Sequence, residues 1–476
     1  MSVTLLSSRF LARAGDWLAR HRGTLIGLQW LVVVFYASLL IIPTLLPLPD
    51  SDARILNNLT VFAQFLFWGI WWPFVLLSMV LLGRAWCGVL CPEGALSEFT
   101  SRFGLNRAMP HWLRWSGWPF VAFAGTTIYG QMVSVYQYPQ AVLVVLGGST
   151  VAAMIIGLIY ARDRRAWCKY LCPVNGVFNL LSRLAPIHFR VDVDAWKNSY
   201  HSHKVIPIVC APMVPIRNMQ GNAECHMCGR CSSHRDAITL SPRSPNAEIV
   251  RVGPPKESMW QTALLLFGML GIAIGAFQWT VSPWMVTLKQ ACAEWLINHD
   301  IMWPLEKSLP WYVFTNYPLH NDVFTILDGT LVVAWIVGVG ALMGCVLSAL
   351  LALGNGALGK WDNKRFQHLA LALVPLAGCG LFLGLSATTV SLLRPEGVNL
   401  TWVQPLRFTL LAGANLWTGV LALGIVRRYA AGNGQRVLAW LSVAIACAVV
   451  DLTWWLMFGG WTVVQWGHCM PGARVC

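Results

Sequence analysis

The nonapeptide RAWCGVLCP (84–92) returns as RAWCKYLCP (165–173), and only its fifth and sixth residues differ between the two copies. The two cysteines of each copy are four positions apart, so on a helix they would lie on one face, one turn from each other. The proline directly after the second cysteine ends or bends such a helix. Each copy therefore presents one pair of thiols, and the near-identical recurrence indicates duplication of a larger unit.

Long hydrophobic runs flank both copies and define the class of protein. Hydrophobic residues make up 56% of the 476 residues and charged residues 11%, whereas about a quarter of a soluble domain is charged. Roughly 20 helical residues cross the hydrocarbon core of a bilayer, so we predict an all-α polytopic membrane protein with about nine transmembrane helices. The predicted spans are residues 24–48, 59–83, 115–135, 140–160, 259–282, 323–353, 366–392, 403–426 and 437–458.

The basic residues of the short loops predict the orientation, because loops rich in Lys and Arg stay on the cytoplasmic side. With nine spans, every basic loop falls on the same side as the N-terminus. These residues are Arg9, Arg13, Arg20, Arg22, Arg84, Arg102, Arg107, Arg114, Arg162, Arg164, Arg165, Lys169, Lys360, Lys364, Arg365, Arg427, Arg428 and Arg436. We expect a cytoplasmic N-terminus, an external C-terminus and a first span that is retained as an anchor. The net charge of +14 fits loops beside anionic lipid, and no nucleic-acid-binding motif is visible.

Two polar stretches interrupt the hydrophobic pattern. Residues 184–257 are rich in Pro, Asn and Ser and are predicted to form a small cytoplasmic segment between spans four and five. Residues 283–322 are predicted to form an external segment, whose tryptophans are typical of the membrane interface. The chain would thus consist of an N-terminal four-helix unit (1–183), the cytoplasmic segment and a C-terminal five-helix unit (258–476).

The predicted cytoplasmic side carries eight cysteines, which is two sets of four. A reducing cytoplasm disfavours structural disulfides, so clustered cysteines there indicate metal binding or redox chemistry. Each nonapeptide follows a hydrophobic hairpin, and two duplicated hairpins packed about a pseudo-twofold axis would bring both thiol pairs together. Four thiolates form a complete ligand set for an iron–sulfur cluster or a structural zinc. We expect one shared cluster, bound by Cys87, Cys91, Cys168 and Cys172.

The second set begins in ECHMCGRCSSHRDAI (224–238), which contains the CxxCxxC core of a ferredoxin cluster loop. The fourth ferredoxin cysteine would lie four positions after Cys231, but Arg235 occupies that place. Cys210 is the favoured fourth ligand, and His234 is the alternative because imidazole can replace thiolate at a cluster. Zinc is the competing metal, although zinc ligands usually come as two separated CxxC pairs. The expected ligands of this cluster are Cys210, Cys225, Cys228 and Cys231.

Few polar groups lie within the C-terminal spans, and those few are candidates for a function in the bilayer. Asp451 lies in span nine, while Asp322 and Asp328 lie at the start of span six. A haem could use His320 and His368, but the predicted orientation puts them on opposite sides of the membrane. Residues 386–389 (SATT) resemble the Ser/Thr-Ala-Thr context of covalent flavin attachment, although hydroxyls inside helices usually bond back to the helix. Neither a haem nor a flavin has a complete motif.

The tail GHCMPGARVC (467–476) would lie in an oxidising compartment if the orientation is as predicted. Cys469 and Cys476 are close enough in sequence for a disulfide across a short loop, and Cys292 could replace either of them. The competing prediction is a Cu(I) site formed by His468, Cys469 and Met470, whose soft donors suit that ion.

The paired CxxxCP motifs after membrane hairpins, followed by a cytoplasmic CxxCxxC segment, resemble the bacterial membrane polyferredoxins of the NapH, NosR and CcoG type. The resemblance covers about residues 25–260 and implies a multi-pass electron-transfer protein of the inner membrane with two [4Fe–4S] clusters. The chain departs from these relatives in having one incomplete ferredoxin run instead of two complete ones. The additional spans, with the segments HDIMWPLEKSLPWYVFTNYPLHNDVF and LGLSATT, look most like the FtrD polyferredoxin of FtrABCD-type iron-uptake systems. That resemblance implies a cupredoxin and an iron permease as companions.

Two functions follow from these patterns. In the first, the chain relays electrons between the cytoplasmic side and a periplasmic redox partner, in support of iron uptake. In the second, the chain is a metal-binding assembly or transport accessory protein that relays no electrons. A redox component is expected rather than a stand-alone enzyme. The first function predicts a brown protein that dithionite bleaches, and the second a colourless protein that contains zinc.

Overall fold

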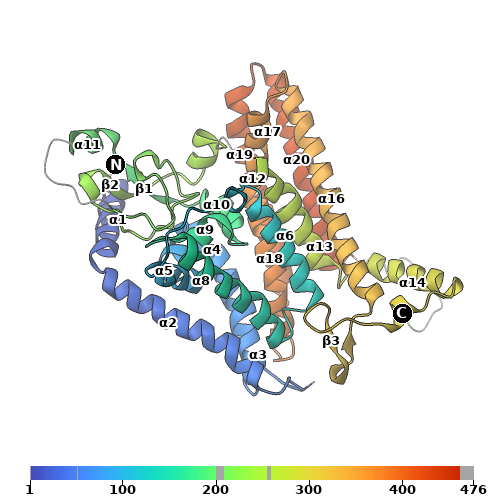
Figure 1. Cartoon of the computed structure of the whole chain (residues 1–476). Coiled ribbons are helices and arrows are strands. Elements are labelled where there is room, and N and C mark those ends of the chain that lie inside the picture. Colours follow the sequence, from blue (N-terminus) through green and yellow to red (C-terminus); the bar gives the residue numbers. More distant parts are fainter. Residues whose placement is uncertain (1, 51, 200–207, 255–258, 461–476) are drawn as a thin grey trace. The chain divides into compact units, whose positions relative to one another are not determined.

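The computed structural model describes residues 2–50, 52–199, 208–254 and 259–460, and helices dominate it (Figure 1). The chain divides into two compact units, each of which combines segments that are distant in sequence. The first unit comprises Met1–Phe123 and Val142–Leu264, and the second comprises Ala124–Ala141 and Leu265–Cys476. The polar segment after the fourth predicted span therefore packs with the N-terminal helices.

The elements of the first unit carry both nonapeptides and the ferredoxin-like segment. They are α1 (Ser2–Arg20), α2 (Arg22–Ile41), α3 (Leu59–Gln64), α4 (Trp72–Leu82), α5 (Pro92–Ser101), α8 (Gly148–Tyr160), α9 (Ala166–Tyr170), α10 (Asn175–Ser182), β1 (Ile187–Val191), α11 (Val193–Asn198), β2 (Ile238–Pro242) and α12 (Met259–Ala263). Helices α6 (Trp118–Met132) and α7 (Pro139–Val142) each contain residues of both units.

The second unit contains the remaining helices and a short two-stranded sheet. Its elements are α13 (Ala273–Gln278), α14 (Pro283–Asn298), α15 (Trp303–Glu306), β3 (Asn316–Tyr317), β4 (Asp322–Val323), α16 (Ile326–Ala357), α17 (Asn363–Leu371), α18 (Val374–Leu393), α19 (Val403–Tyr429) and α20 (Asn433–Trp455). The predicted external segment is thus mainly the helix α14 and the antiparallel pair β3 and β4.

Eight helical stretches among the described residues are long and apolar enough to cross a membrane, which confirms the predicted all-α polytopic class. They are Arg22–Leu45, Leu59–Leu82, Pro139–Tyr160, Met259–Gln278, Ile326–Ala357, Val374–Leu393, Val403–Tyr429 and Asn433–Gly459. Each overlaps one predicted span. The third predicted span, 115–135, contains α6, which has 15 residues. Such a helix is about 22 Å long, shorter than a hydrocarbon core of about 30 Å.

Local sequence explains where several of these helices begin. Thr325 and Asp328 form a reciprocal capping box at the start of α16, and Lys289 lies 2.5 Å from the Asp328 carboxylate. The Asp362 side chain accepts a hydrogen bond from the Lys364 amide and caps α17. Pro375 lies in the first turn of α18, where a missing N–H costs nothing. The predicted seventh span therefore begins as two helices rather than one.

The ferredoxin-like segment has a small core of its own, built on the antiparallel pair β1 and β2 with Phe189 opposite Leu240. Phe189, Ile238 and Met227 are buried in this core. Leu11 of α1 packs against it, so the amphipathic N-terminal helix covers the segment. This strand pair of five residues each was not among the sequence predictions.

Candidate metal centre

The two nonapeptides adopt the same local conformation at their second cysteine. The Cys91 amide donates to the Trp86 carbonyl at 2.9 Å, and the Cys172 amide donates to the Trp167 carbonyl at 3.0 Å. Both bonds span five residues, although the first copy forms a π-helix (Trp86–Leu90) and the second forms the α-helix α9, which ends with this wider bond. Cys91 also caps α5, because its sulfur accepts a hydrogen bond from the Gly94 amide at 3.4 Å.

The structure brings the four cysteines of the two copies together, and we call them the first quartet. Burial raises the pKa of the Cys91 thiol well above its usual value, and the nearby Cys168 and Cys87 thiolates raise it further. Burial also raises the pKa of Cys172, where Glu93 and the other three thiols add to the effect. Four buried thiols therefore lie within electrostatic reach of one another. A bound cation would favour their thiolate form, because metal coordination deprotonates a thiol.

The arginine that begins each nonapeptide contacts residues of the other copy. Arg84 donates to the Asn175 side chain at 2.6 Å. The guanidinium of Arg165 lies against Gly94, because a Cβ atom at Gly94 would be 3.0 Å from Arg165 Nη1. Gly94 is the counterpart of Asn175 in the first copy, since the two residues are 81 positions apart, as the copies are. Arg165 also donates to the Cys87 carbonyl. This reciprocal exchange explains why the arginine is repeated together with the cysteines.

Glu98 connects the second copy to the ferredoxin-like loop. Its carboxylate accepts from Arg165 Nε at 2.8 Å and from the Arg230 guanidinium. Burial acts to raise the pKa of Glu98, but the two guanidiniums lower it below its usual value. The carboxylate is thus ionised between two cations. Removing one partner of such a buried ion pair destabilises the folded protein, because the other charge stays buried without compensation.

The second quartet consists of Cys210, Cys225, Cys228 and Cys231. Burial raises the pKa of Cys225 to about 12, and the Cys228 and Cys210 thiolates contribute. Burial raises the pKa of Cys231 as well, with contributions from all three other thiols of the quartet. These four thiols therefore also lie within electrostatic reach of one another, although Cys210 lies 15 positions before the CxxCxxC core.

The loop of the second quartet alternates between ordinary and left-handed backbone conformations. Met227 has a φ of 52° and Gly229 a φ of 74°, and successive amides in such a loop can point toward one acceptor. The Met227 amide donates to the Cys225 sulfur at 3.4 Å. A Cβ atom at Gly229 would overlap the Leu18 side chain of α1. Glycine is therefore required there by conformation and by the closeness of α1.

The alternative ligand His234 has a different neighbour. Its ring meets the Trp196 ring edge to face, with 5.5 Å between the ring centroids. Cys210, in contrast, acts on the pKa of both Cys225 and Cys231. The arrangement favours Cys210 as the fourth ligand.

Replacing Cys210 with alanine is expected to abolish the visible absorption of the second cluster and about half of the bound iron, because one of its four ligands is lost. Replacing His234 with alanine is expected to leave the spectrum nearly unchanged, since its ring packs on Trp196. Visible absorption and iron content of the two purified variants provide the measurement. The reverse result would indicate a mixed-ligand cluster with a raised potential.

Gly88, between the cysteines of the first copy, lies directly against the backbone of the second quartet. A Cβ atom there would overlap the His226 carbonyl oxygen and lie 2.9 Å from the Cys228 nitrogen. The Gly88 carbonyl accepts from the buried Gln29 amide of α2 at 3.0 Å. The second copy has Lys169 at this position, and its ammonium donates to the Met213 carbonyl at 2.9 Å. The fifth residue of the nonapeptide therefore differs because each copy has a different neighbour.

Across the described residues, no three or more His, Cys, Asp and Glu side chains are grouped closely enough to bind one metal ion together. A [4Fe–4S] cluster does not need that closeness, because each of its four thiolates binds a different iron atom. The donor set of both quartets fits such a cluster, because each has four thiols that are buried or half-buried. Sequence reasoning missed the contributions of Arg84, Arg165, Glu98 and Gly88, although the repeated arginine was a visible signal.

The other candidates from the sequence occupy ordinary structural positions or lie elsewhere. His368 Nδ1 is 2.9 Å from the Tyr429 hydroxyl, and Ser386 bonds back to the Leu383 carbonyl at 2.8 Å. Asp451 accepts two bonds of 2.9 Å from the Asn415 amide. Asp322 accepts from the Tyr138 hydroxyl at 2.7 Å. The predicted disulfide or copper site at His468, Cys469, Met470 and Cys476 lies outside the described residues.

Comparison with known proteins agrees with this chemistry. Residues 64–110 and 144–192 match the 4Fe-4S binding domain, and each segment contains one nonapeptide. A relative is YccM of Escherichia coli (strain K12), a proposed electron transport protein, which is 26% identical over 229 residues, or 42% of this chain and 62% of the relative. The chain thus matches less than two thirds of the length of that relative. No solved structure matches the chain. The chain is therefore a polytopic helical membrane protein with two segments similar to a 4Fe-4S binding domain.

Proposed function

We propose that this protein is an iron–sulfur electron-transport protein with two [4Fe–4S] clusters. The first cluster would be bound by Cys87, Cys91, Cys168 and Cys172, and the second by Cys210, Cys225, Cys228 and Cys231. The match of both nonapeptides to a 4Fe-4S binding domain supports the cofactor, and the similarity to YccM supports electron transport.

The contact between Gly88 and Cys228 carries the proposal. Gly88 follows the ligand Cys87 directly, and a Cβ atom at Gly88 would be 3.0 Å from Cys228 Cα. The two quartets are therefore separated by little more than one layer of backbone. A structural or storage role does not require two metal sites so close together, whereas electron exchange between them becomes faster as the distance shortens.

Two buried arginine side chains lie near both quartets, and their positive charge would stabilise negatively charged clusters there. The Arg84 and Arg165 side chains are 3% and 1% exposed. Arg165 lies close enough to act electrostatically on both Cys168 and Cys228. Arg84 acts in the same way on Cys168 and Cys225. Each guanidinium thus lies near a thiol of both quartets and would balance part of the charge that eight thiolates bring.

We place both quartets on the cytoplasmic side of the inner membrane, with the C-terminus in the periplasm. Because the two nonapeptides lie together, the chain between them must cross the membrane an even number of times. The span Pro139–Tyr160 accounts for one crossing. The other would be α6 together with the turns that continue it to residue 138, despite its 15 helical residues. This assignment agrees with the positions of the basic loops.

The proposed route ends at a periplasmic redox partner such as a cupredoxin, in support of iron uptake by a permease. The architecture of the C-terminal unit supports this part of the proposal through its resemblance to FtrD. Asp451 and Asn415, which are bonded to each other on α20 and α19, are polar groups within that unit that could take part in coupling across the bilayer.

Protein purified without oxygen is expected to be brown and to contain about eight iron atoms per chain, four for each cluster. Its absorption in the blue region is expected to bleach when dithionite is added. Iron and acid-labile sulfide analysis with anaerobic absorption spectra would test this. A colourless protein containing zinc would contradict the electron-transport function and support the metal-binding accessory function.

A further inference from the structure

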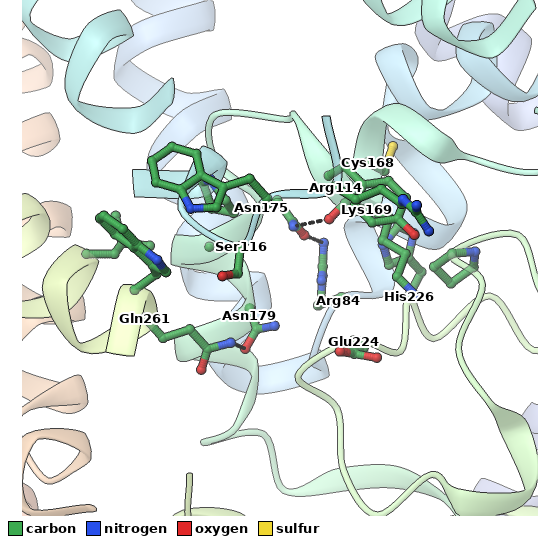
Figure 2. A pocket seen from close by; sticks show the side chains of 17 residues that line it. Arg84, Arg114, Ser116, Cys168, Lys169, Asn175, Asn179, Glu224, His226 and Gln261 are labelled. Atoms are coloured by element: carbon green, nitrogen blue, oxygen red, sulfur yellow. Dashed lines mark hydrogen bonds between the residues drawn. The ribbon is translucent and has the colours of Figure 1, made fainter. Parts of the chain in front are cut away.

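A cavity of about 360 Å³ lies in the first unit beside the second nonapeptide, and Cys168 forms part of its wall (Figure 2). Hydrogen bonds connect several of the side chains that line it. Asn175 donates to the Lys169 carbonyl at 3.0 Å and accepts from Arg84, and these bonds are drawn in Figure 2. Gln261 is bonded to Asn179 at 3.4 Å. The cavity is therefore largely formed before any ligand is present.

Two of the side chains at the wall are almost completely buried. Arg84 and His226 line the cavity and are 3% and 1% exposed. Among the described residues, neither Arg84 Nε nor His226 Nδ1 has a hydrogen-bond partner. Both atoms have almost no accessible surface, so they lie behind the cavity surface, and the two side chains contribute mainly the positive charge of Arg84 to this part of the wall.

The charged residues of the wall are mostly cationic. Arg84, Arg114 and Lys169 line the cavity together with one carboxylate, that of Glu224. The Lys169 ammonium donates one hydrogen bond to the Met213 carbonyl, and its other two N–H groups can donate to a ligand. Arg114 is exposed and is free to move toward a ligand. A phosphate group matches this set, because arginine and lysine are its usual partners in proteins.

Two tryptophan rings form the apolar part of the wall. Trp115 and Trp260 meet edge to face, with 4.8 Å between their centroids. They keep 40% and 36% of their surface exposed. A flat aromatic ligand could stack on such a surface, as aromatic rings do on one another. A lipid headgroup would supply the phosphate but no ring, and a quinone would supply a ring but no phosphate.

We propose that this cavity binds a phosphorylated planar heterocycle of the flavin mononucleotide class. The phosphate would lie at Arg114 and Lys169, near the buried charge of Arg84, and the ring would lie against Trp115 and Trp260. The position of Cys168 in the wall places a ligand of this class beside the first quartet. The inference goes beyond electron transport by the clusters, and its test does not depend on that function.

Equilibrium dialysis of the full-length protein in detergent against flavin mononucleotide would test the inference. We expect saturable binding of one equivalent. The expected dissociation constant for riboflavin, which lacks the phosphate, is at least about tenfold higher, as is that of Arg114→Glu for flavin mononucleotide, since each change removes a charge-assisted contact. Arg107→Glu is the matched control, because Arg107 is exposed in the same loop and does not line the cavity. This control is expected to bind as the unmodified protein does.

Several results would overturn the inference. These are a lack of saturable binding, equal affinity for riboflavin, or equal weakening by Arg114→Glu and Arg107→Glu. Displacement of the bound flavin mononucleotide by an uncharged quinone analogue, or by phosphatidylglycerol vesicles, would assign the cavity to another class of ligand. Each of these results leaves the iron content and the dithionite bleaching of the protein unchanged, so failure here is distinct from failure of the proposed function.

Discussion

Replacing either Cys87 or Cys168 with serine is expected to remove the same iron, about half of the total. The double variant is expected to lose no more than either single variant. The physical reason is that the first quartet takes two thiols from each nonapeptide, and the Cys87 and Cys168 thiols both act on Cys91. Iron and acid-labile sulfide per chain, measured on the three purified variants, provide the comparison.

Cys345→Ser is the matched control, because Cys345 is an exposed cysteine of α16 and belongs to neither quartet. It is expected to retain all of the iron. Additive losses from Cys87→Ser and Cys168→Ser would show that each nonapeptide binds metal separately, and the shared cluster would have to be abandoned.

Replacing Gly88 with alanine is expected to reduce the iron content of both quartets and to destabilise the first unit. The added methyl group would overlap the His226 carbonyl oxygen, which is backbone and cannot rotate away. Overpacking of this kind costs about 1–3 kcal/mol and sometimes more. It would push the loop that carries Cys228 away from the turn that carries Cys87. The iron content and the midpoint of thermal unfolding would be measured together.

Gly148→Ala provides the matched control, because a Cβ atom at Gly148 has nothing within 4 Å. Within the helix α8, this change is expected to stabilise the protein by about 0.5–1 kcal/mol and to leave the iron unchanged. If Gly88→Ala behaved in the same way as Gly148→Ala, the close contact between the quartets would be wrong.

Most of the membrane architecture could be predicted from hydrophobicity alone, because the lipid-facing surface requires long apolar helices. The span Leu59–Leu82, for example, was expected at residues 59–83. Hydrophobicity overestimated the length of α6. The apolar run of residues 115–135 has 21 residues, but α6 contains only 15 of them. The run begins with Trp115 and ends in turns, and composition does not reveal where an apolar segment stops being helical.

Seven of the eight cysteines were grouped from the sequence because thiols at short, repeated spacings favour metal binding, whereas Cys210, 15 positions before the CxxCxxC core, was assigned only as the other cysteine of the segment; the ligand sets stay predictions. Their mutual contact was not predictable, since it depends on the missing side chain of Gly88, and a single glycine in a hydrophobic sequence has many explanations. The same limit applies to Glu98, which lies seven positions after Cys91 and carries no motif. Its role is visible only in the structure, where its carboxylate forms ion pairs with both Arg165 and Arg230.

The bonds of Arg84 also constrain how the protein can be made. Its guanidinium binds Asn175 and Ala223, which lie 91 and 139 positions later in the chain. A ribosome adding 5–20 residues per second needs roughly ten to thirty seconds to produce the second of these partners. Before the first of these partners is made, this arginine lacks both of its observed acceptors. Under the proposed function, delivery of iron and sulfide to the first quartet would therefore come late in biogenesis, after the second nonapeptide and the ferredoxin-like segment have been made.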